Sequence, residues 1–209
     1  MPKIRSSYQL HIQLCDTKPA VWRRLVVADT TTLAQLHQTI QAAMGWENRH
    51  RYAFEIAGQH YGLPNADLPE DPTMDARRYT VGQLLQGAAV AVRYLYDFGD
   101  GWLHRIKLEA CTPVGSPAAL TSLPMCLGGR HACPPEDCGG PPGFAALLQA
   151  LQDPLQAEYL AARRQLPTGW DAKHFDLAAA QARIHALQLL RAPGQRYGQV
   201  QAATHAALA

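Results

Sequence analysis

The sequence predicts an α+β fold: a β-grasp-like mixed sheet packed on one main helix, with a loop rich in cysteine, proline and glycine and a helical C-terminal part. Three observations predict this class. Residues 8–15 alternate between apolar and polar side chains, which is typical of a half-buried strand. Apolar residues then recur at helical spacing over 33–44, which predicts an amphipathic helix. From residue 144 onward the patterns are helical.

The first elements are predicted to be a hairpin followed by the main helix. Residues 16–19 combine Asp and Pro in a turn signal, and the β-rich run 21–28 follows, so the strands on either side are expected to pair antiparallel. Thr30 to Thr32 offer an N-cap for the helix. Gly45 is a natural stop, because glycine readily adopts the left-handed conformation that ends many helices.

The rest of the sheet is predicted from the middle of the chain. β-rich runs indicate strands at about 51–57, 90–96 and 103–110, and the last two flank an Asp-Phe-Gly-Asp-Gly turn that is typical of a hairpin. The segment 58–78 is rich in proline and acidic residues and is predicted to be a loop, with a short helix near 81–85. The order of these strands around one helix suggests the β-grasp-like sheet.

Regular structure is predicted to stop where prolines, glycines and cysteines are concentrated, and to resume as three helices. The predicted helices lie at 144–151, about 155–166 and 177–190. The chain therefore divides into a sheet core at 1–111, a loop packed on that core at 112–143, a helical part of the same domain at 144–192 and a flexible tail at 193–209.

Composition limits the classes of function. The chain has 209 residues, 47% of them hydrophobic, which is enough for the core of one domain. A net charge of +2 is too small to indicate nucleic-acid binding by itself. No apolar run is long enough to span a bilayer, and the N-terminus lacks the hydrophobic stretch of a secretory signal, so we expect no membrane partner and a cytoplasmic location. The five cysteines, an odd number, argue against a disulfide framework.

The Asp-Phe-Gly-Asp-Gly turn is one of two segments that indicate function. Asp97 and Asp100 lie three residues apart between aromatic side chains, and Trp102 follows them. Two carboxylates at the mouth of a cleft can bind a metal or act as an acid–base pair. They can equally hydrogen-bond the backbone of their own turn, as Asp commonly does. Both interpretations stay open on the sequence alone.

The other segment is a cysteine cluster. Cys126, Cys133 and Cys138 fall within 13 residues, and thiolates bind zinc well in closed tetrahedral sites. We expect His104 to be the fourth ligand, because strand alternation turns it toward the apolar face; His131, between two of the cysteines, is the alternative. Buried free thiols are the competing interpretation, and a nucleophilic cysteine is a third, although no base is visible beside it.

Four stretches of the chain resemble the plasmid pRiA4b ORF-3-like proteins, a family also described as insertion-element passenger proteins of a TnpR type. The stretches are Pro-Ala-Val-Trp-Arg-Arg at 19–24, a Thr-Leu…Met-Gly-Trp…His…Phe pattern at 32–54, Tyr-Asp-Phe-Gly-Asp-Gly-Trp-Leu-His at 96–104, and Cys…Cys-Pro-Pro-Glu-Asp-Cys-Gly-Gly…Gly-Phe at 126–144. Together they cover about 8–190 in the order that the family has.

The resemblance implies an α+β fold and a small prokaryotic protein, sometimes encoded near mobile elements, with no established reaction. The TnpR label suggests a resolvase, which the sequence does not support. A serine recombinase needs a nucleophilic serine framed by arginines, and Ser6 and Ser7 precede the first strand without that setting. The C-terminal tail is neither basic nor of helix-turn-helix type.

The leading functional hypothesis is a non-enzymatic binding module with a structural zinc site. It presents a cleft to a protein or small-molecule partner that the sequence does not identify. Glu136 and Asp137 are interpreted as groups that order their loop. The candidate cleft residues are Asp97, Asp100, Trp102, Trp46, His50 and Trp22.

Two other hypotheses belong to different classes. A metal-dependent hydrolase would use Asp97, Asp100 and His104, and it needs an open coordination position on the metal. A DNA-binding accessory protein of a mobile element needs several arginines on one face. The arginines available for such a face are Arg23, Arg24, Arg49, Arg51, Arg77 and Arg78.

Overall fold

The computed structural model describes residues 5–65, 70, 72–85 and 91–190. Within them, strands occupy most of the N-terminal part and helices the C-terminal part. The strands are β1 (Arg5–Leu14), β2 (Trp22–Ala28), β3 (Tyr52–Ile56), β4 (Gln59–Gly62), β5 (Met74–Asp75), β6 (Val92–Tyr96), β7 (Trp102–Val114) and β8 (Met125–Arg130). The helices are α1 (Leu33–Met44), α2 (Val81–Leu84), α3 (Gly140–Ala150), α4 (Ala157–Arg164) and α5 (Leu177–Leu190), with a short 3-10 turn η1 (Pro117–Leu120).

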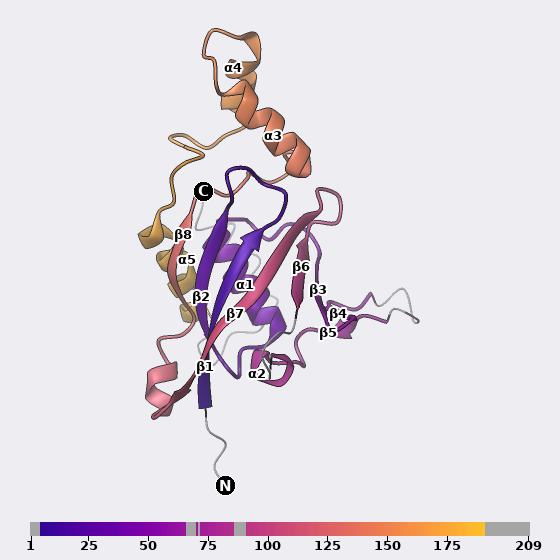
Figure 1. Cartoon of the computed structure of the whole chain (residues 1–209), viewed down its shortest axis with the longest axis vertical. Helices are drawn as coiled ribbons and strands as arrows, with labels where there is room; N and C mark the ends of the chain where they lie inside the picture. The colour runs from indigo at the N-terminus through magenta and orange to yellow at the C-terminus, as the bar shows by residue number, and fades with distance from the viewer. Residues whose placement is uncertain (1–4, 66–69, 71, 86–90, 191–209) are drawn as a thin grey trace.

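All eight strands belong to one sheet, in the order β5-β4-β3-β6-β7-β1-β2-β8. Neighbouring strands are antiparallel except β4 and β5, which are parallel. Helices α1 and α5 lie side by side on one face of this sheet (Figure 1). The predicted α+β class, with a mixed sheet packed on a main helix, is therefore confirmed.

The side of the sheet that the helices cover carries the core, because β1 and β2 alternate strictly. Leu10, Ile12 and Leu14 of β1 are buried there, and so are Leu25 and Val27 of β2. Each such side chain contributes roughly 1.5–3 kcal/mol when it is fully buried. The alternation predicted for the first strand is confirmed, and the strand begins earlier than predicted because its first residues pair with the end of β7.

Helix α1 begins and ends where the sequence predicts. The Thr32 side chain accepts a hydrogen bond from the Gln35 backbone N–H at 3.2 Å, and the Gln35 side chain accepts one from the Thr32 N–H at 3.0 Å, which forms a capping box. Gly45 ends the helix with φ at 95°, in the left-handed region. The neighbouring α5 is attached through Arg183, which donates to the Ala42 carbonyl at 2.7 Å.

The opposite side of the sheet, which we call the open face, carries no helix of the described part (Figure 1). Antiparallel sheets commonly keep one face solvated, and apolar-in, polar-out alternation is the result. The outward side chains used below are half-buried or exposed: His11, Gln13, Trp22, Arg24, Arg93, Arg105 and Lys107.

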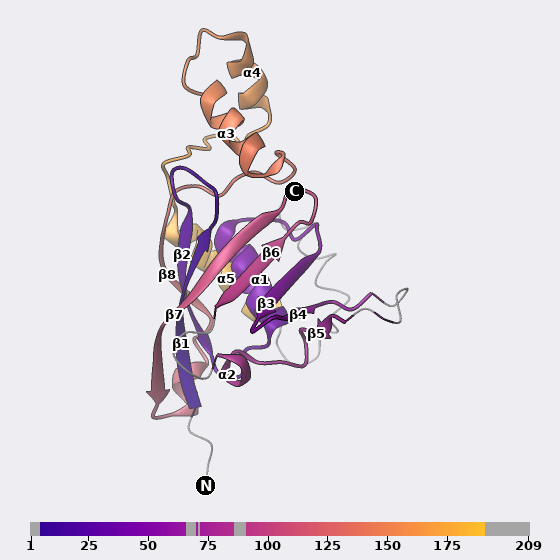
Figure 2. The same ribbon diagram turned by 45° about the vertical axis from the view of Figure 1, so that its right-hand side comes forward.

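Helices α3 and α4 form a part that protrudes from one end of the sheet (Figure 2). Phe144 and Leu147 of α3 are buried, and so are Ala162 and Leu166 from the α4 region. The segment that leads from α4 to α5 then returns along the sheet, and its Trp170 packs edge-on against Phe144, with ring centroids 6.4 Å apart. None of the helices in the described ranges combines the length and apolarity of a bilayer span.

The predicted loop at 112–143 is wrong in part. Strand β7 extends into it, β8 pairs with β2 inside it, and α3 begins before its end. The sequence of β8 contains two glycines and has weak strand propensity, so its structure comes from pairing with β2 and packing against α5 rather than from its own pattern. The predicted loop at 58–78 likewise contains β4 and β5. Residue 90 and the tail at 193–209 lie outside the described residues.

Candidate metal centre

His50 lies in the link between α1 and β3, and its neighbours fix this link. Asn48, whose φ is 58°, hydrogen-bonds through Oδ1 to Nε2 of the buried His37 at 2.7 Å. The backbone N–H of Arg49 donates to the Tyr96 hydroxyl at 3.1 Å. The imidazole of His50 therefore lies beside the end of β6, with 29% of its side chain exposed.

Asp97 follows β6 and starts the turn toward β7. Its φ of 56° places it in the left-handed region, which Asp tolerates better than most residues. Its Oδ1 accepts hydrogen bonds from the N–H groups of Gly99 and Asp100, at 2.9 and 3.3 Å. Its own N–H donates to the Arg51 carbonyl at 2.9 Å. One carboxylate oxygen thus orders the turn, and the other, Oδ2, faces His50.

The segment between β8 and α3 supplies two more carboxylates. Oε1 of Glu136 accepts hydrogen bonds from the Tyr96 hydroxyl and from the Glu47 N–H, each at 2.9 Å. Oε2 of Glu136 is buried and has no hydrogen-bond partner. Asp137 follows with φ at 56°, and 58% of its side chain is exposed. One of these two neighbours is therefore inside the site and the other is at its mouth.

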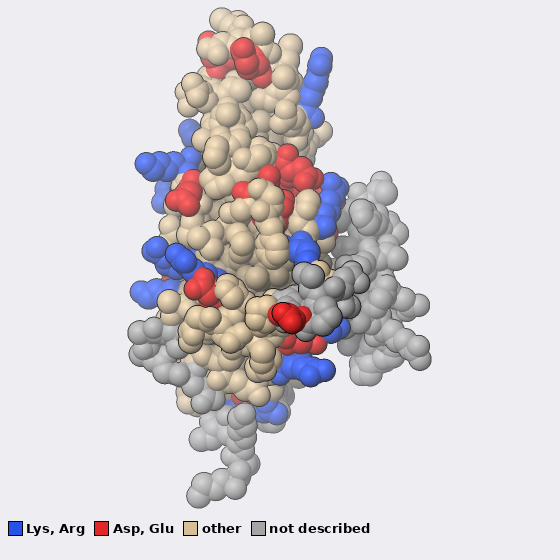
Figure 3. All heavy atoms as spheres, turned by 90° about the vertical axis from the view of Figure 1, so that its right-hand side faces the viewer, with Lys and Arg blue, Asp and Glu red and all other residues tan. Residues whose placement is uncertain are grey.

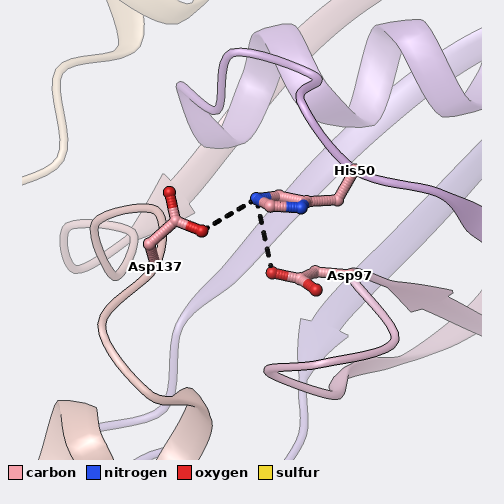
Figure 4. Close-up of side chains that lie close together, drawn as sticks. All are labelled: His50, Asp97 and Asp137. Carbon is pink, nitrogen blue, oxygen red and sulfur yellow. Dashed lines mark ion pairs between the residues drawn. The ribbon is translucent and has the colours of Figure 1, made fainter.

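These groups converge on Nε2 of His50. Nε2 lies 3.0 Å from Oδ1 of Asp137, 3.5 Å from Oδ2 of Asp97 and 4.0 Å from Oε2 of Glu136. Figure 4 shows the imidazole pointing between the two aspartates, which come from different loops. None of these oxygens lies in the right direction to accept a hydrogen bond from Nε2, and this buried nitrogen has no other hydrogen-bond partner. His50, Asp97 and Asp137 are the described residues whose ligand atoms lie close enough together, within 4.8 Å, to hold one metal ion.

A close backbone approach holds the two loops together. The Gly139 N–H donates to Oδ2 of Asp100 at 3.2 Å. Gly140 has φ at 66°, and a Cβ atom there would lie 2.2 Å from the Asp100 carbonyl oxygen. A side chain at Gly140 would therefore push the segment that carries Asp137 away from the turn that carries Asp97.

Electrostatics in the site are dominated by negative charge. Burial is the main cause that raises the pKa of Glu136, and the neighbouring Asp137 raises it further. Burial also raises the pKa of Tyr96 well above its usual range, and Glu136 adds to that shift. Figure 3 shows acidic side chains gathered at the base of the protruding part, with basic side chains beside them. Carboxylates this close repel one another unless a proton or a cation lies between them.

The predicted cleft residues separate into three groups. His50 and Asp97 are in the site, and Asp100 binds the Gly139 N–H instead of facing His50. Trp46 and Trp102 are buried beneath the site; the Trp46 indole N–H donates to the Pro134 carbonyl at 2.9 Å and so supports the Glu136 segment. Trp22 is half-buried on the open face, where it stacks on His11.

The predicted zinc ligands are not brought together as one group in the described part of the chain. His104 is completely buried, as predicted, but its Nδ1 lies 3.2 Å from the Tyr94 carbonyl and burial lowers its pKa to about 4. The alternative ligand, His131, has its Nδ1 2.9 Å from the Ala20 carbonyl. Burial raises the pKa of each of the three thiols, that of Cys138 to about 12.

The DNA-binding hypothesis needs its arginines on one face, and two of them, Arg23 and Arg24, point to opposite faces of the sheet. Arg23 points toward α1, where its Nε donates to the Ala43 carbonyl at 3.0 Å and its guanidinium lies 4.1 Å from the centre of the Phe175 ring. Arg24, the next residue, points to the open face and pairs with Glu109. Strand alternation makes this separation unavoidable for neighbours in sequence.

Glu136 and Asp137 are the site residues whose role the sequence analysis missed. The sequence predicts only that they order their loop, and Glu136 does accept hydrogen bonds from two other segments. The signal that could have found them is the acidic pair between a Pro-Pro and a Cys-Gly-Gly, in the same family motif as the cysteines. No spacing rule connects that pair with His50 or Asp97, which lie on other segments.

Comparisons with known proteins agree with the fold and the motifs. The model of the plasmid pRiA4b ORF-3-like protein family matches residues 6–179. An uncharacterized protein, y4hQ of Sinorhizobium fredii, is 43% identical over 152 residues, which is 72% of this chain and 76% of that protein. The crystal structure of a protein of unknown function, MM3350 from Methanosarcina mazei Go1, superimposes with a TM-score of 0.72 at 29% identity, covering 84% of this chain and 98% of that one. The chain therefore belongs to the plasmid pRiA4b ORF-3-like family.

Proposed function

We propose that this protein binds a divalent transition metal, with His50, Asp97 and Asp137 as ligands and Glu136 beside them. The observation that carries the proposal is the pair of buried atoms without hydrogen bonds, Nε2 of His50 and Oε2 of Glu136, which face each other among carboxylates. Buried polar atoms are nearly always paired in proteins. A cation between them would satisfy both atoms and remove the repulsion among the carboxylates.

The donor set indicates which ion to expect. One imidazole nitrogen with carboxylate oxygens suits zinc, manganese or ferrous iron, whereas calcium and magnesium favour oxygen ligands alone. Zinc is our first choice, because an imidazole with two carboxylates is a donor set that zinc accepts in a four-coordinate site. The cysteine-based zinc site proposed from the sequence is a separate hypothesis, and the two make different predictions.

Titration of chelator-treated protein with Zn²⁺ and Mn²⁺ by calorimetry tests this function. We expect one metal ion per chain and a lower affinity for the ion in Asp137→Asn. Because the Asp137 side chain is exposed, this substitution should not disturb folding. Asp171→Asn, an exposed carboxylate elsewhere, is the matched control. Cys126→Ser with Cys138→Ser should leave the titration unchanged. Loss of binding in the cysteine variant with retention in Asp137→Asn would refute the proposed site in favour of the cysteines.

A metal-dependent hydrolase is the second candidate function. It is favoured by the uneven exposure of the site: Asp97 and Glu136 are each 9% exposed, while His50 and Asp137 are 29% and 58% exposed. Solvent therefore reaches one side of the site, as catalytic metal centres require for a bound water. Metal-dependent cleavage of an activated phosphodiester or ester, lost in Asp137→Asn and kept in Asp171→Asn, would support this activity.

A further inference from the structure

The open face carries two rows of side chains that run across the strands. Register places His11 opposite Arg24 on one side and Lys107 on the other, and Gln13 opposite Trp22 and Arg105. Arg105 in turn lies opposite Arg93 of β6. The two rows are Arg24–His11–Lys107 and Trp22–Gln13–Arg105–Arg93.

Charge on this face is unbalanced. Arg24 is neutralised by Glu109 through two contacts of 2.6 and 2.9 Å, and Arg93 lies 3.7 Å from Glu55. Arg105 and Lys107 are exposed, and neither forms an ion pair with any residue of the described part. The net charge of the whole chain is only +2. The two cations without acidic partners, Arg105 and Lys107, nevertheless lie two residues apart on the same face of β7.

The register itself places like charges together. Arg93 and Arg105 lie directly opposite each other on neighbouring strands, an arrangement that destabilises a sheet, and Glu55, 3.7 Å from Arg93, compensates only one of the two charges. In Figure 3, turned by 90° from Figure 1, Lys and Arg side chains project along the left edge, where the open face lies. An anion bound there would offset this repulsion.

Aromatic rings lie beside these cations. His11 and Trp22 are stacked, with ring centroids 5.1 Å apart, and the Arg24 guanidinium lies 5.3 Å from the centre of the Trp22 ring. An open depression of about 310 Å³ adjoins them, lined by His11, Gln13, Arg24, Arg105, Lys107 and Glu109. A row of cations beside an aromatic ring on an open sheet is the arrangement that holds the backbone and the bases of an unpaired strand.

We propose that the open face binds single-stranded nucleic acid, with Arg105 and Lys107 contacting successive phosphates and Trp22 stacking on a base. The two cations are about 7 Å apart along their strand, at roughly 3.4 Å per residue. A single strand fits better than a duplex, because the surface is a sheet without a helix or ribbon that could enter a groove, and duplex bases are not free to stack.

The test is fluorescence polarisation of a labelled 12-nucleotide single strand, as DNA and as RNA, against the full chain over a range of salt. We expect Arg105→Gln with Lys107→Gln to weaken binding at least about tenfold and to reduce the slope of log K against log salt by about 1.4, since each phosphate contact on a single strand contributes about 0.7. Arg164→Gln with Lys173→Gln removes the same charge from exposed positions elsewhere and should change affinity less than about twofold.

A second variant tests stacking separately. Trp22→Ala should weaken binding about tenfold without changing the salt slope, and it should remove the contribution of Trp22 to the quenching of tryptophan fluorescence on binding. All the substituted side chains point outward, so we expect each variant to fold. Thermal melting verifies this. No binding by the wild type at low salt, equal loss in both charge variants, or equal affinity for a matched duplex would each overturn the proposal. So would complete competition by millimolar inorganic phosphate, which would indicate a small-anion site instead.

Discussion

The metal centre and the open face shift the pKa values of their carboxyl groups in opposite directions. In the metal centre, burial raises the pKa of Glu136, and the nearby Asp137 adds to that shift. On the open face, hydrogen bonding from the Arg24 guanidinium lowers the pKa of Glu109 to about 2. The first region gathers three carboxylates, and the nearest arginine, Arg49, lies 3.9 Å from Asp137 at the exposed side of the site. The second region has cations in excess of its carboxylates.

The difference indicates which ligand each region can accept. A site that disfavours the ionised form of its carboxyl groups is stabilised by a bound cation. A surface with unpaired cationic side chains is stabilised by a bound anion. The two regions also differ in construction. Loops from three parts of the chain form the metal centre, whereas strand register alone forms the open face. The metal centre should therefore be far more sensitive to small backbone changes.

The largest effect is expected for removal of the central ligand of the metal centre. His50→Ala should lower zinc affinity at least about 100-fold, since even residues that only orient metal ligands typically contribute 10–100-fold. Titration calorimetry on chelator-treated protein measures this change. His60→Ala is the control, because His60 is an exposed histidine on β4. Unchanged affinity in His50→Ala would remove the basis of the comparison between the two regions.

The sensitivity of the loops to backbone changes gives the next largest effect. Gly140→Ala should lower the free energy of unfolding by about 2 kcal/mol or more, because it combines a left-handed φ with a clash against the Asp100 carbonyl. Gly58→Ala has a similar φ of 78° in open space and should cost only about 1 kcal/mol. Chemical denaturation compares the two. If both variants lose the same free energy of unfolding, the clash with the Asp100 carbonyl adds no cost and the two loops are not in close contact at Gly140.

Glu136→Gln should raise the free energy of unfolding at neutral pH, whereas the glycine variants lower it. The folded-state pKa of this carboxyl is raised, so its contribution favours folding below its unfolded pKa and is lost as pH rises. At pH 7 the metal-free variant should be more stable than the wild type by up to about 1 kcal/mol, and this gain should vanish near pH 4. Zinc affinity should fall in the same variant. A destabilised variant at pH 7 would show that the hydrogen bonds to Glu136 outweigh its buried charge.

The smallest effect is expected on the open face. The lowered pKa of Glu109 means that its pairing with Arg24 favours folding above pH 4.5 and is lost as pH falls toward about 2. Because the pair is near the surface, Glu109→Gln should lower Tm by at most about 3 °C at pH 7, with no difference near pH 2. The same variant should bind a single strand more tightly, since Arg24 is released. Tighter binding is absent if the open face does not contact nucleic acid.

The elements that could be predicted from the sequence are those specified by local patterns. The alternation in β1 and the capping box of α1 need only neighbouring residues, and both are where they were predicted. Strand β8 was missed because its pairing with β2 is non-local and its own residues have weak strand propensity. The burial of His104 was predicted by period two, but its distance from the cysteines was not.

The sequence by itself determined the α+β class, the main helix with both of its ends, the alternation of the first strand, and membership of the family. Only the tertiary structure decided that His50, Asp97 and Asp137 meet while Cys126, Cys133 and Cys138 do not gather with His104. The physical reason is that alternation and capping act between neighbours in sequence. Contact between two loops depends instead on how the sheet places their ends, and on a glycine that lets their backbones approach.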